Sequence, residues 1–236
     1  MAKDKSKKDA ELSIGEKILD LVQKNRKKIL ISFIVLVLVL TTSVIVVTVR
    51  ANFHDAALVR VDEFERRFIL LQSVDELNLD QELAFLRISE IHLLLDELNE
   101  FQNSFTTFSY ASARGYSLQA DIHWFLHNFS EAEAAWLNAA AASAGSYLEP
   151  VSIYNAAVAA EEQGNIAAAI AHYTRVLELS EFFPSPARAQ FAIGRLEEGR
   201  GSRDAALNAY NNVLRSWPDD PLWANLAQSR IAALGN

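Results

Sequence analysis

The feature that most constrains this 236-residue chain is a continuous apolar stretch at residues 29–49. Its sequence, ILISFIVLVLVLTTSVIVVTV, has no charged residue, and Lys27, Lys28 and Arg50 flank it. At ~1.5 Å per residue, a helix of this length extends roughly 30 Å, which matches the hydrocarbon core of a bilayer. The stretch also lacks the polar face of a helix that packs on a soluble core. We therefore predict one transmembrane helix over residues 29–49.

A cleaved secretory signal peptide is the alternative interpretation of this stretch. The apolar region of such a peptide has only about 7 to 15 residues and ends in a small-x-small cleavage site. The nearest candidate, Val49-Arg50-Ala51, places an arginine inside that site. We therefore expect an uncleaved signal-anchor.

The charges on the two sides of this stretch differ in sign. All eight lysines lie in residues 1–28, which carry a net charge of +4, whereas residues 51–236 carry −13. Cationic flanks stay on the cytoplasmic side, so residues 1–28 are predicted to be a basic cytoplasmic tail. In a bacterial cell this corresponds to a single-pass protein of the inner membrane, with its larger, acidic part in the periplasm. The acidic part argues against nucleic acid as a partner.

The residues that carry chemistry in enzymes are sparse here. The absence of cysteine excludes disulfides and thiolate catalysis. His123 and His127 have a spacing that can place two imidazoles on one metal, but a metal site needs a third ligand. Only Asp121 and Glu131 lie near enough in the sequence to supply it. We predict no catalytic residues, no metal and no cofactor, and hence a protein that is not an enzyme.

Two apolar stripes follow the anchor, with steps of three and four residues that place each stripe on one face of a helix. The first stripe is Ala57, Val61, Phe64, Phe68 and Leu71, and the second is Ala84, Ile88, Ile91, Leu95 and Leu98. A short polar segment, residues 73–78, separates them. We predict an antiparallel helical hairpin within residues 50–104. The alternative for these stripes is a coiled-coil dimer, that is, self-association of the chain.

Residues 105–236 contain an internal repeat with a spacing of 37 residues. The three units are 113–149, 150–186 and 187–223. Each has a small residue, an alanine twelve positions later and an aromatic residue four positions after that: Ala120, Ala132 and Trp136; Ala157, Ala169 and Tyr173; Gly194, Ala206 and Tyr210. Turn-forming pairs begin at His127, Gly164 and Gly201. Small residues let two helices approach closely, so we predict one helix pair per unit.

These Ala-x3-aromatic pairs resemble the tetratricopeptide repeat (TPR) family, whose motif of ~34 residues is a helix pair. Pro218 matches the proline that often ends a unit, although the units here are three residues longer. The resemblance implies an all-α fold in which a TPR-like α-solenoid follows the transmembrane helix and the hairpin. The last unit of such a stack needs a cap. Residues 222–234, with Leu226, Ile231 and Leu234 on the apolar side, are predicted to be this capping helix.

Three local patterns predict further details. Ser130-x-x-Glu133 fits a capping box that opens the second helix of the first unit. The carboxylate pairs Glu161-Glu162 and Glu197-Glu198 are interpreted as solvated helix faces. The segment Phe182-Phe183-Pro184 is predicted to be a loop between units, because proline cannot continue a helix.

In TPR proteins the first helices of successive units line a concave groove that binds peptides. Carried over by position, the resemblance places eleven residues in this groove: Arg114, Asp121, Trp124, Phe125, Tyr154, Val158, Glu161, Glu162, Arg188, Phe191 and Arg195. Aromatic and arginine side chains are common in binding hot spots. The lysines with which some TPR proteins grip a C-terminal carboxylate are absent from this region.

The layout of tail, single span and helical repeats resembles membrane-anchored bacterial TPR proteins that accompany the Sec translocon and periplasmic chaperones. This resemblance implies an adaptor that binds other proteins or peptides outside the cytoplasm and acts in export, folding or assembly of the cell envelope. The alternative is a structural scaffold that self-associates through the hairpin within an envelope complex.

Overall fold

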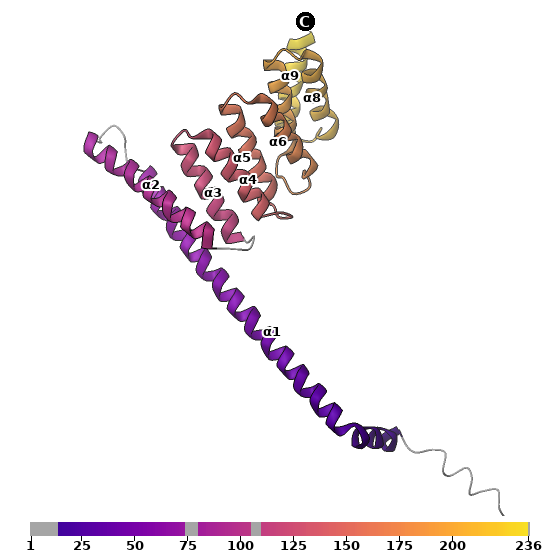
Figure 1. Ribbon diagram of the computed structural model, residues 1–236. Coiled ribbons are helices and arrows are strands. Elements are labelled where there is room, and N and C mark those ends of the chain that lie inside the picture. The colour runs from indigo at the N-terminus through magenta and orange to yellow at the C-terminus, as the bar shows by residue number, and fades with distance from the viewer. Residues whose placement is uncertain (1–13, 74–79, 105–109, 236) are drawn as a thin grey trace, which may run out of the picture. The chain divides into compact units, whose positions relative to one another are not determined.

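The computed structural model describes residues 14–73, 80–104 and 110–235. Within these ranges the chain forms nine helices and no strand, which confirms the predicted all-α class (Figure 1). The helices are α1 (Ile14–Gln72), α2 (Gln81–Ser104), α3 (Tyr110–Phe125), α4 (Phe129–Ala142), α5 (Leu148–Glu162), α6 (Ile166–Glu178), α7 (Pro186–Gly199), α8 (Arg203–Ser216) and α9 (Pro221–Gly235). The chain divides into two compact units, residues 1–55 and 56–236.

The first unit contains the apolar stretch, which lies entirely within α1. This helix is long and apolar enough to cross a membrane, and none of its apolar window is buried. Asn25, with φ of −112° and ψ of 15°, kinks the helix before the apolar stretch begins. The hydroxyls of Thr41 and Thr42 donate to the carbonyls of Val37 and Leu38, at 2.9 and 2.6 Å. These two hydroxyls are thus satisfied within the helix.

The second unit begins with a hairpin in which the end of α1 packs against α2. Phe64 and Phe101 meet edge to face, with ring centroids 5.8 Å apart. Arg67 donates to both oxygens of Glu97, at 2.8 and 3.0 Å. Arg87 donates from Nε to the Leu71 carbonyl at 2.7 Å. The two helices are antiparallel, since later residues of α1 meet earlier residues of α2.

The buried face of α2 differs from the predicted stripe. Ile91, Leu95 and Leu98 are buried as expected, but Ile88 is 38% exposed. The side chain of Arg87 is buried in its place, because its guanidinium reaches the carbonyl at the end of α1. Leu94 completes the buried face.

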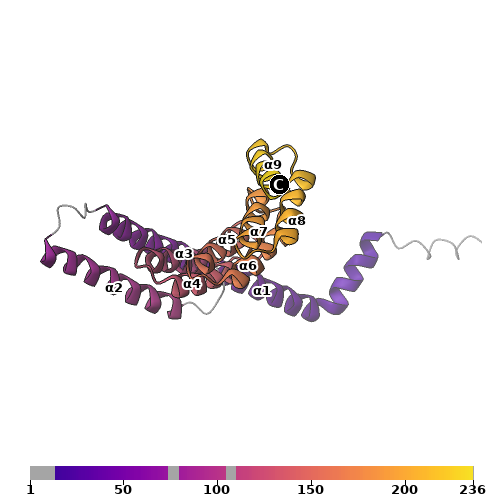
Figure 2. The same ribbon diagram turned by 90° about the horizontal axis from the view of Figure 1, so that it is seen from above.

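Helices α3 to α8 form three stacked helix pairs, each packed on the next in chain order (Figure 2). The alanines that the repeat places on the second helix of each pair, Ala132, Ala169 and Ala206, have no exposed surface. Tyr173 and Tyr210 are almost completely buried one turn further along. The small residues therefore mark the sites of close helix approach, which confirms the packing inferred from the repeat.

The turn inside each pair has the same backbone geometry in all three units. His127, Gly164 and Gly201 have φ of 60°, 72° and 81°, the left-handed conformation that ends helices. The next residue is the N-cap of the second helix in every unit. In the first unit this N-cap is Asn128, and it makes no side-chain capping bond. The capping box predicted at Ser130 and Glu133 is therefore wrong, because the left-handed residue starts the helix earlier.

The last helix, α9, covers the end of the stack as predicted, with a rotated apolar face. Ala227 is buried, and Trp223, Ile231 and Leu234 pack against the cluster around Tyr210. Leu226, predicted on the apolar side, is 40% exposed. The small side chain of Ala227 lets α9 approach α8 closely, and this orientation turns Leu226 away from the stack.

The close helix approach in the third unit yields a prediction. A Cβ atom added at Gly194 would lie 2.6 Å from a ring carbon of Tyr210. Overpacking of this kind costs about 1–3 kcal/mol, and the better helix propensity of alanine offsets ~1 kcal/mol. We expect Gly194→Ala to lower the free energy of unfolding by up to about 2 kcal/mol. The measurement is urea unfolding of the detergent-solubilised chain, followed by fluorescence of Trp217 and Trp223 beside Tyr210.

The matched control is Gly199→Ala, because a Cβ atom at Gly199, the last residue of α7, meets nothing within 4 Å. This variant should unfold at the same urea concentration as the parent chain or at a higher one. Identical midpoints for the two alanine variants would show that the contact with Tyr210 does not limit helix approach.

Candidate functional site

The first helices of the pairs, α3, α5 and α7, together with α9 form the inner side of the stack. Contacts between alternate helices occur here, with α3 touching α5 and α7 touching α9. Open pockets of about 570, 270 and 460 Å³ lie on this side. We call the surface that joins them the inner groove.

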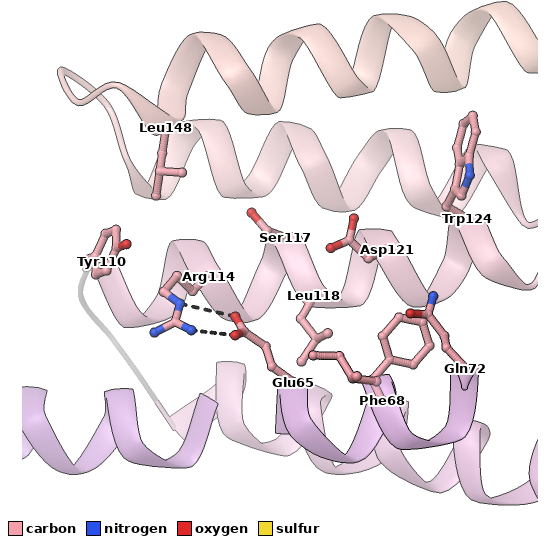
Figure 3. Close-up of a pocket in the computed structure, with 11 residues that line it drawn as sticks. Glu65, Phe68, Gln72, Tyr110, Arg114, Ser117, Leu118, Asp121, Trp124 and Leu148 are labelled. Carbon is pink, nitrogen blue, oxygen red and sulfur yellow. Dashed lines mark hydrogen bonds and ion pairs between the residues drawn. The ribbon is translucent and has the colours of Figure 1, made fainter. Parts of the chain in front are cut away.

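The largest of the three, the first-unit pocket, lies between the end of α1, helix α3 and the start of α5 (Figure 3). Arg114 of α3 is already neutralised there. Its Nε and Nη2 donate to the carboxylate of Glu65 at 3.2 and 2.6 Å, and its Nη1 lies 2.7 Å from Asp62. Phe68, Leu118 and Leu148 supply apolar walls.

Asp121 is the acidic side chain of this pocket that has no counter-ion. Among the described residues no hydrogen bond or ion pair to its carboxylate is found, and Figure 3 shows bonds from Arg114 to Glu65 only. The side chain is open to solvent at the pocket mouth, yet protein atoms surround it on most sides. This desolvation, together with the negative charge of Glu65, raises the pKa of Asp121 to about 6.

A second pocket, the tryptophan pocket, adjoins the first and shares Asp121 and Trp124 with it. Trp124 of α3 and Trp136 of α4 are tilted against each other with ring centroids 5.7 Å apart. Asn155 and Val158 of α5 close the far side. The two pockets together offer indole surface next to an unpaired carboxylate.

The later units carry a polar bridge at the corresponding place. Glu161 of α5 accepts a hydrogen bond from the Tyr173 hydroxyl at 2.5 Å and forms an ion pair with Arg195 of α7. Burial and the hydrogen bond to Glu161 raise the pKa of Tyr173. We call this arrangement the Glu–Tyr–Arg bridge. It links one unit to the next across the inner groove.

The third unit repeats this bridge with α9. Glu198 accepts from the Tyr210 hydroxyl at 2.8 Å and from Arg230 Nε at 3.0 Å. Burial, followed by the bond to Glu198, raises the pKa of Tyr210 to about 12, and the bond from Arg230 lowers the pKa of Glu198. The interpretation of the carboxylate pairs as solvated faces therefore fails for Glu161 and Glu198. It also fails for Glu197, which is buried and accepts from Arg200 Nε at 2.6 Å. It holds for Glu162, which is exposed.

The remaining groove residues predicted from the sequence are placed in two different environments. Tyr154 is buried and stacks on Phe183, while the guanidinium of Arg188 lies 4.8 Å from its ring centroid. Phe191 is half-buried between the rings of Tyr210 and Trp223. These residues contribute to the wall of the groove more than to its open surface.

Phe125 lies away from the groove. Its ring meets Phe68 edge to face at 5.8 Å, and the guanidinium of Arg87 lies 5.2 Å from its centroid. It belongs to the core that joins the hairpin to α3.

The lining residues that sequence reasoning missed include Glu65, Gln72, Trp136 and Asn155. Two of them come from the hairpin and one from a second helix, which the first-helix rule ignores. Trp136 could have been found from the repeat, because it aligns with Tyr173 and Tyr210. Both tyrosines donate to the bridge carboxylates beside the groove.

The described residues contain no group of three or more His, Cys, Asp or Glu side chains that could hold a metal ion. His127 lies in the turn after α3, with φ of 60°, and not on the helix that carries His123. The two histidines therefore do not lie one turn apart on a single helix, which was the reason to consider them together as metal ligands.

A stack of helix pairs with an open inner groove defines an α-solenoid repeat protein, a class that uses its concave surface to bind other polypeptides. The family model of the tetratricopeptide repeat matches residues 117–180 and 154–221. A TPR repeat-containing protein of Treponema pallidum (strain Nichols) is 35% identical over 127 residues, which cover 54% of this chain and 52% of that protein. The chain thus matches about half the length of this relative.

Residues 117–221 therefore match tetratricopeptide repeats, as the resemblance of the Ala-x3-aromatic pairs implied. Such repeats are generally modules for protein interaction and not for catalysis.

The unpaired state of Asp121 predicts a pH-dependent stability. Because the folded chain raises the pKa of this carboxyl above its unfolded value of about 3.9, ionisation between about pH 4 and pH 6 destabilises the fold. Asp121→Asn removes the ionisation. We expect this variant to unfold at a higher temperature than the parent chain above pH 6, with the difference shrinking as the pH falls to 4.

The control for this measurement is Asp219→Asn, which makes the same change at an exposed position in the loop before α9. Its difference from the parent chain should not grow between pH 4 and pH 7. If Asp121→Asn were less stable than the parent chain at every pH, the carboxylate would have a partner that stabilises its charged form.

Proposed function

We propose that this protein is a membrane-tethered adaptor that holds a partner polypeptide in its inner groove on the extracytoplasmic side. The observation that carries the proposal is the set of unpaired groups in the first half of the groove. There Asp121 has no counter-ion and the indoles of Trp124 and Trp136 line a pocket, whereas the later units satisfy their charges internally. Unsatisfied polar and aromatic groups in a concavity favour ligand binding.

The apolar stretch of α1 supports the tether, since it is long enough to span a bilayer and unburied. The nine basic residues before it favour an N-terminus in the cytoplasm. This topology would place the acidic repeats in the periplasm of a bacterial cell, where an adaptor acts in export, folding or envelope assembly. Among these three processes the groove favours none.

Site-specific crosslinking tests the groove, because the chain has no native cysteine and every introduced thiol is unique. Ser117→Cys and Asn155→Cys place a photoreactive maleimide inside the groove. Ala171→Cys and Asn208→Cys place it on exposed positions of α6 and α8 and are the controls. We expect both inner probes to capture the same protein in native membranes, and the outer probes to capture it at least tenfold less. Equal capture from both sides would exclude the groove as the binding surface.

Cysteine accessibility tests the topology in the same way. We expect Ser229→Cys, an exposed position on α9, to react with a membrane-impermeant maleimide in intact spheroplasts. Ser6→Cys, in the lysine-rich tail, should react only after lysis. The reverse pattern would place the repeats in the cytoplasm.

The second candidate function is a scaffold that self-associates through the hairpin. The observation in its favour is a row of exposed apolar side chains on α2, where Phe85, Leu86 and Leu93 are 71%, 50% and 49% exposed. Under this hypothesis Ser89→Cys, exposed on the same helix, forms a disulfide-linked dimer in membranes upon mild oxidation. A monomer under these conditions favours the adaptor.

A further inference from the structure

The three repeat units serve as internal controls for one another. At the spacing of 37 residues, one set of equivalent positions holds Trp124, Glu161 and Glu198, and a second holds Trp136, Tyr173 and Tyr210. A third set holds Asp121, Val158 and Arg195. The first unit thus has two tryptophans where the later units have the Glu and Tyr of the bridge.

The charge at the third set of positions is reversed between the units. Arg195 extends from the third unit to the carboxylate of Glu161 in the unit before it. At the equivalent place Asp121 of the first unit faces Glu65 of α1, the element before it, and the two negative charges repel. Both places line an open pocket, but the side chain there is a cation in the later unit and an acid in the first unit.

The cation present in the first-unit pocket does not compensate for this difference. Arg114 is held by the two carboxylates of Glu65 and Asp62, so it adds no net positive charge beside Asp121. The pocket therefore has an excess of negative charge, inside a region of residues 51–236 with a net charge of −13.

The shape of the site fits a long basic side chain. Trp124 lines both the first-unit pocket and the tryptophan pocket, and Asp121 lies beside it in both. An indole face attracts a guanidinium or ammonium group, and a planar guanidinium also stacks on it. The aliphatic stem of such a side chain would contact Val158, and its charge would lie near the carboxylate.

We propose that the first-unit pocket binds an arginine side chain of the partner polypeptide, with the guanidinium between Asp121 and Glu65 and against the ring of Trp124. In effect the partner supplies the cation that Arg195 supplies in the later unit. This inference rests on the proposed function and specifies its ligand: a basic segment of a protein, recognised by charge and by stacking.

Tryptophan resonances of the full chain in detergent micelles test this proposal. The chain has four tryptophans, of which Trp124 and Trp136 line the site, while Trp217 and Trp223 lie at the far end beside Tyr210. The probe is an acetylated and amidated peptide of seven residues, with one central arginine among serines and alanines. We expect this peptide to shift the indole N–H signals of the first two tryptophans and not those of the other two.

A peptide with citrulline, the uncharged isostere, replacing arginine should bind at least tenfold more weakly. Asp121→Asn should weaken the binding of the arginine peptide by about tenfold, which corresponds to ~1.4 kcal/mol. Asp121→Arg recreates the charge pattern of Arg195 and should abolish binding while the chain stays folded. Asp219→Asn, with the same loss of charge at a remote exposed position, should bind like the parent chain. Unchanged signals of Trp217 and Trp223 verify the fold of each variant.

Three results would overturn the proposal. The first is equal binding of the citrulline peptide. The second is equal binding by the Asp121→Arg variant. The third is a shift of the same signals by free spermidine at the concentration of the peptide, which would identify a small polyamine as the ligand.

The two proposals can fail separately. If Ser117→Cys and Asn155→Cys capture a partner but the peptide does not bind, the adaptor function stands and the arginine subsite is wrong. If the peptide binds but crosslinking captures the partner equally from the outer positions, the adaptor's use of the groove is wrong.

Discussion

The close approach of the two helices in each repeat unit is the contact on which the rest of the structure depends. Ala132, Ala169 and Ala206 have no exposed surface, and in the third unit a glycine faces the ring of Tyr210 so tightly that no Cβ atom fits. This approach fixes where the aromatic ring lies. The hydroxyl of Tyr210 then reaches the carboxylate of Glu198, which is also held by Arg230 of the next helix. Small residues thus position the polar bridges of the groove.

The same packing has a different result in the first unit. Tryptophan takes the places of the bridge residues, so the helices still pack but without a Glu–Tyr–Arg bridge. Polar contacts between this unit and the next are made instead by Glu133 of α4, with Gln163 and His172. The unpaired carboxylate of Asp121 accompanies these substitutions. A solenoid that pairs the charges of its groove at one end and leaves a carboxylate unpaired at the other is suited to bind a ligand at the unpaired end.

Much of the fold could be predicted from the sequence because the three repeat units can be aligned with one another. The turns at His127, Gly164 and Gly201 and the buried alanines were found by alignment at one spacing. Details that depend on helix rotation were not found. Ile88 and Leu226 occupy plausible apolar positions, but Arg87 and Ala227 take the buried places beside them. Periodicity alone does not distinguish rotations of a helix by part of a turn.

The candidate site was predicted only in part, because the repeat gives the positions of groove residues but not their contacts. Asp121, Trp124 and Val158 were assigned to one groove and line one pocket, and Glu161 was assigned there beside Arg195. The bridge itself was missed, since its carboxylate meets an arginine 34 residues away. Phe125 was assigned to the groove together with Trp124, yet adjacent residues on a helix point about 100° apart. The contribution of Glu65 depends on how the hairpin docks on α3, which the repeat does not encode.

The most direct measurement is a structure of the full chain bound to a partner that the groove crosslinks identify. The account predicts that the partner lies along α3 and α5, with a basic side chain against Trp124 and within hydrogen-bonding distance of Asp121. A partner bound to the outer helices α4, α6 and α8, or to the exposed face of α2, with the pockets beside Asp121 left open, would contradict it.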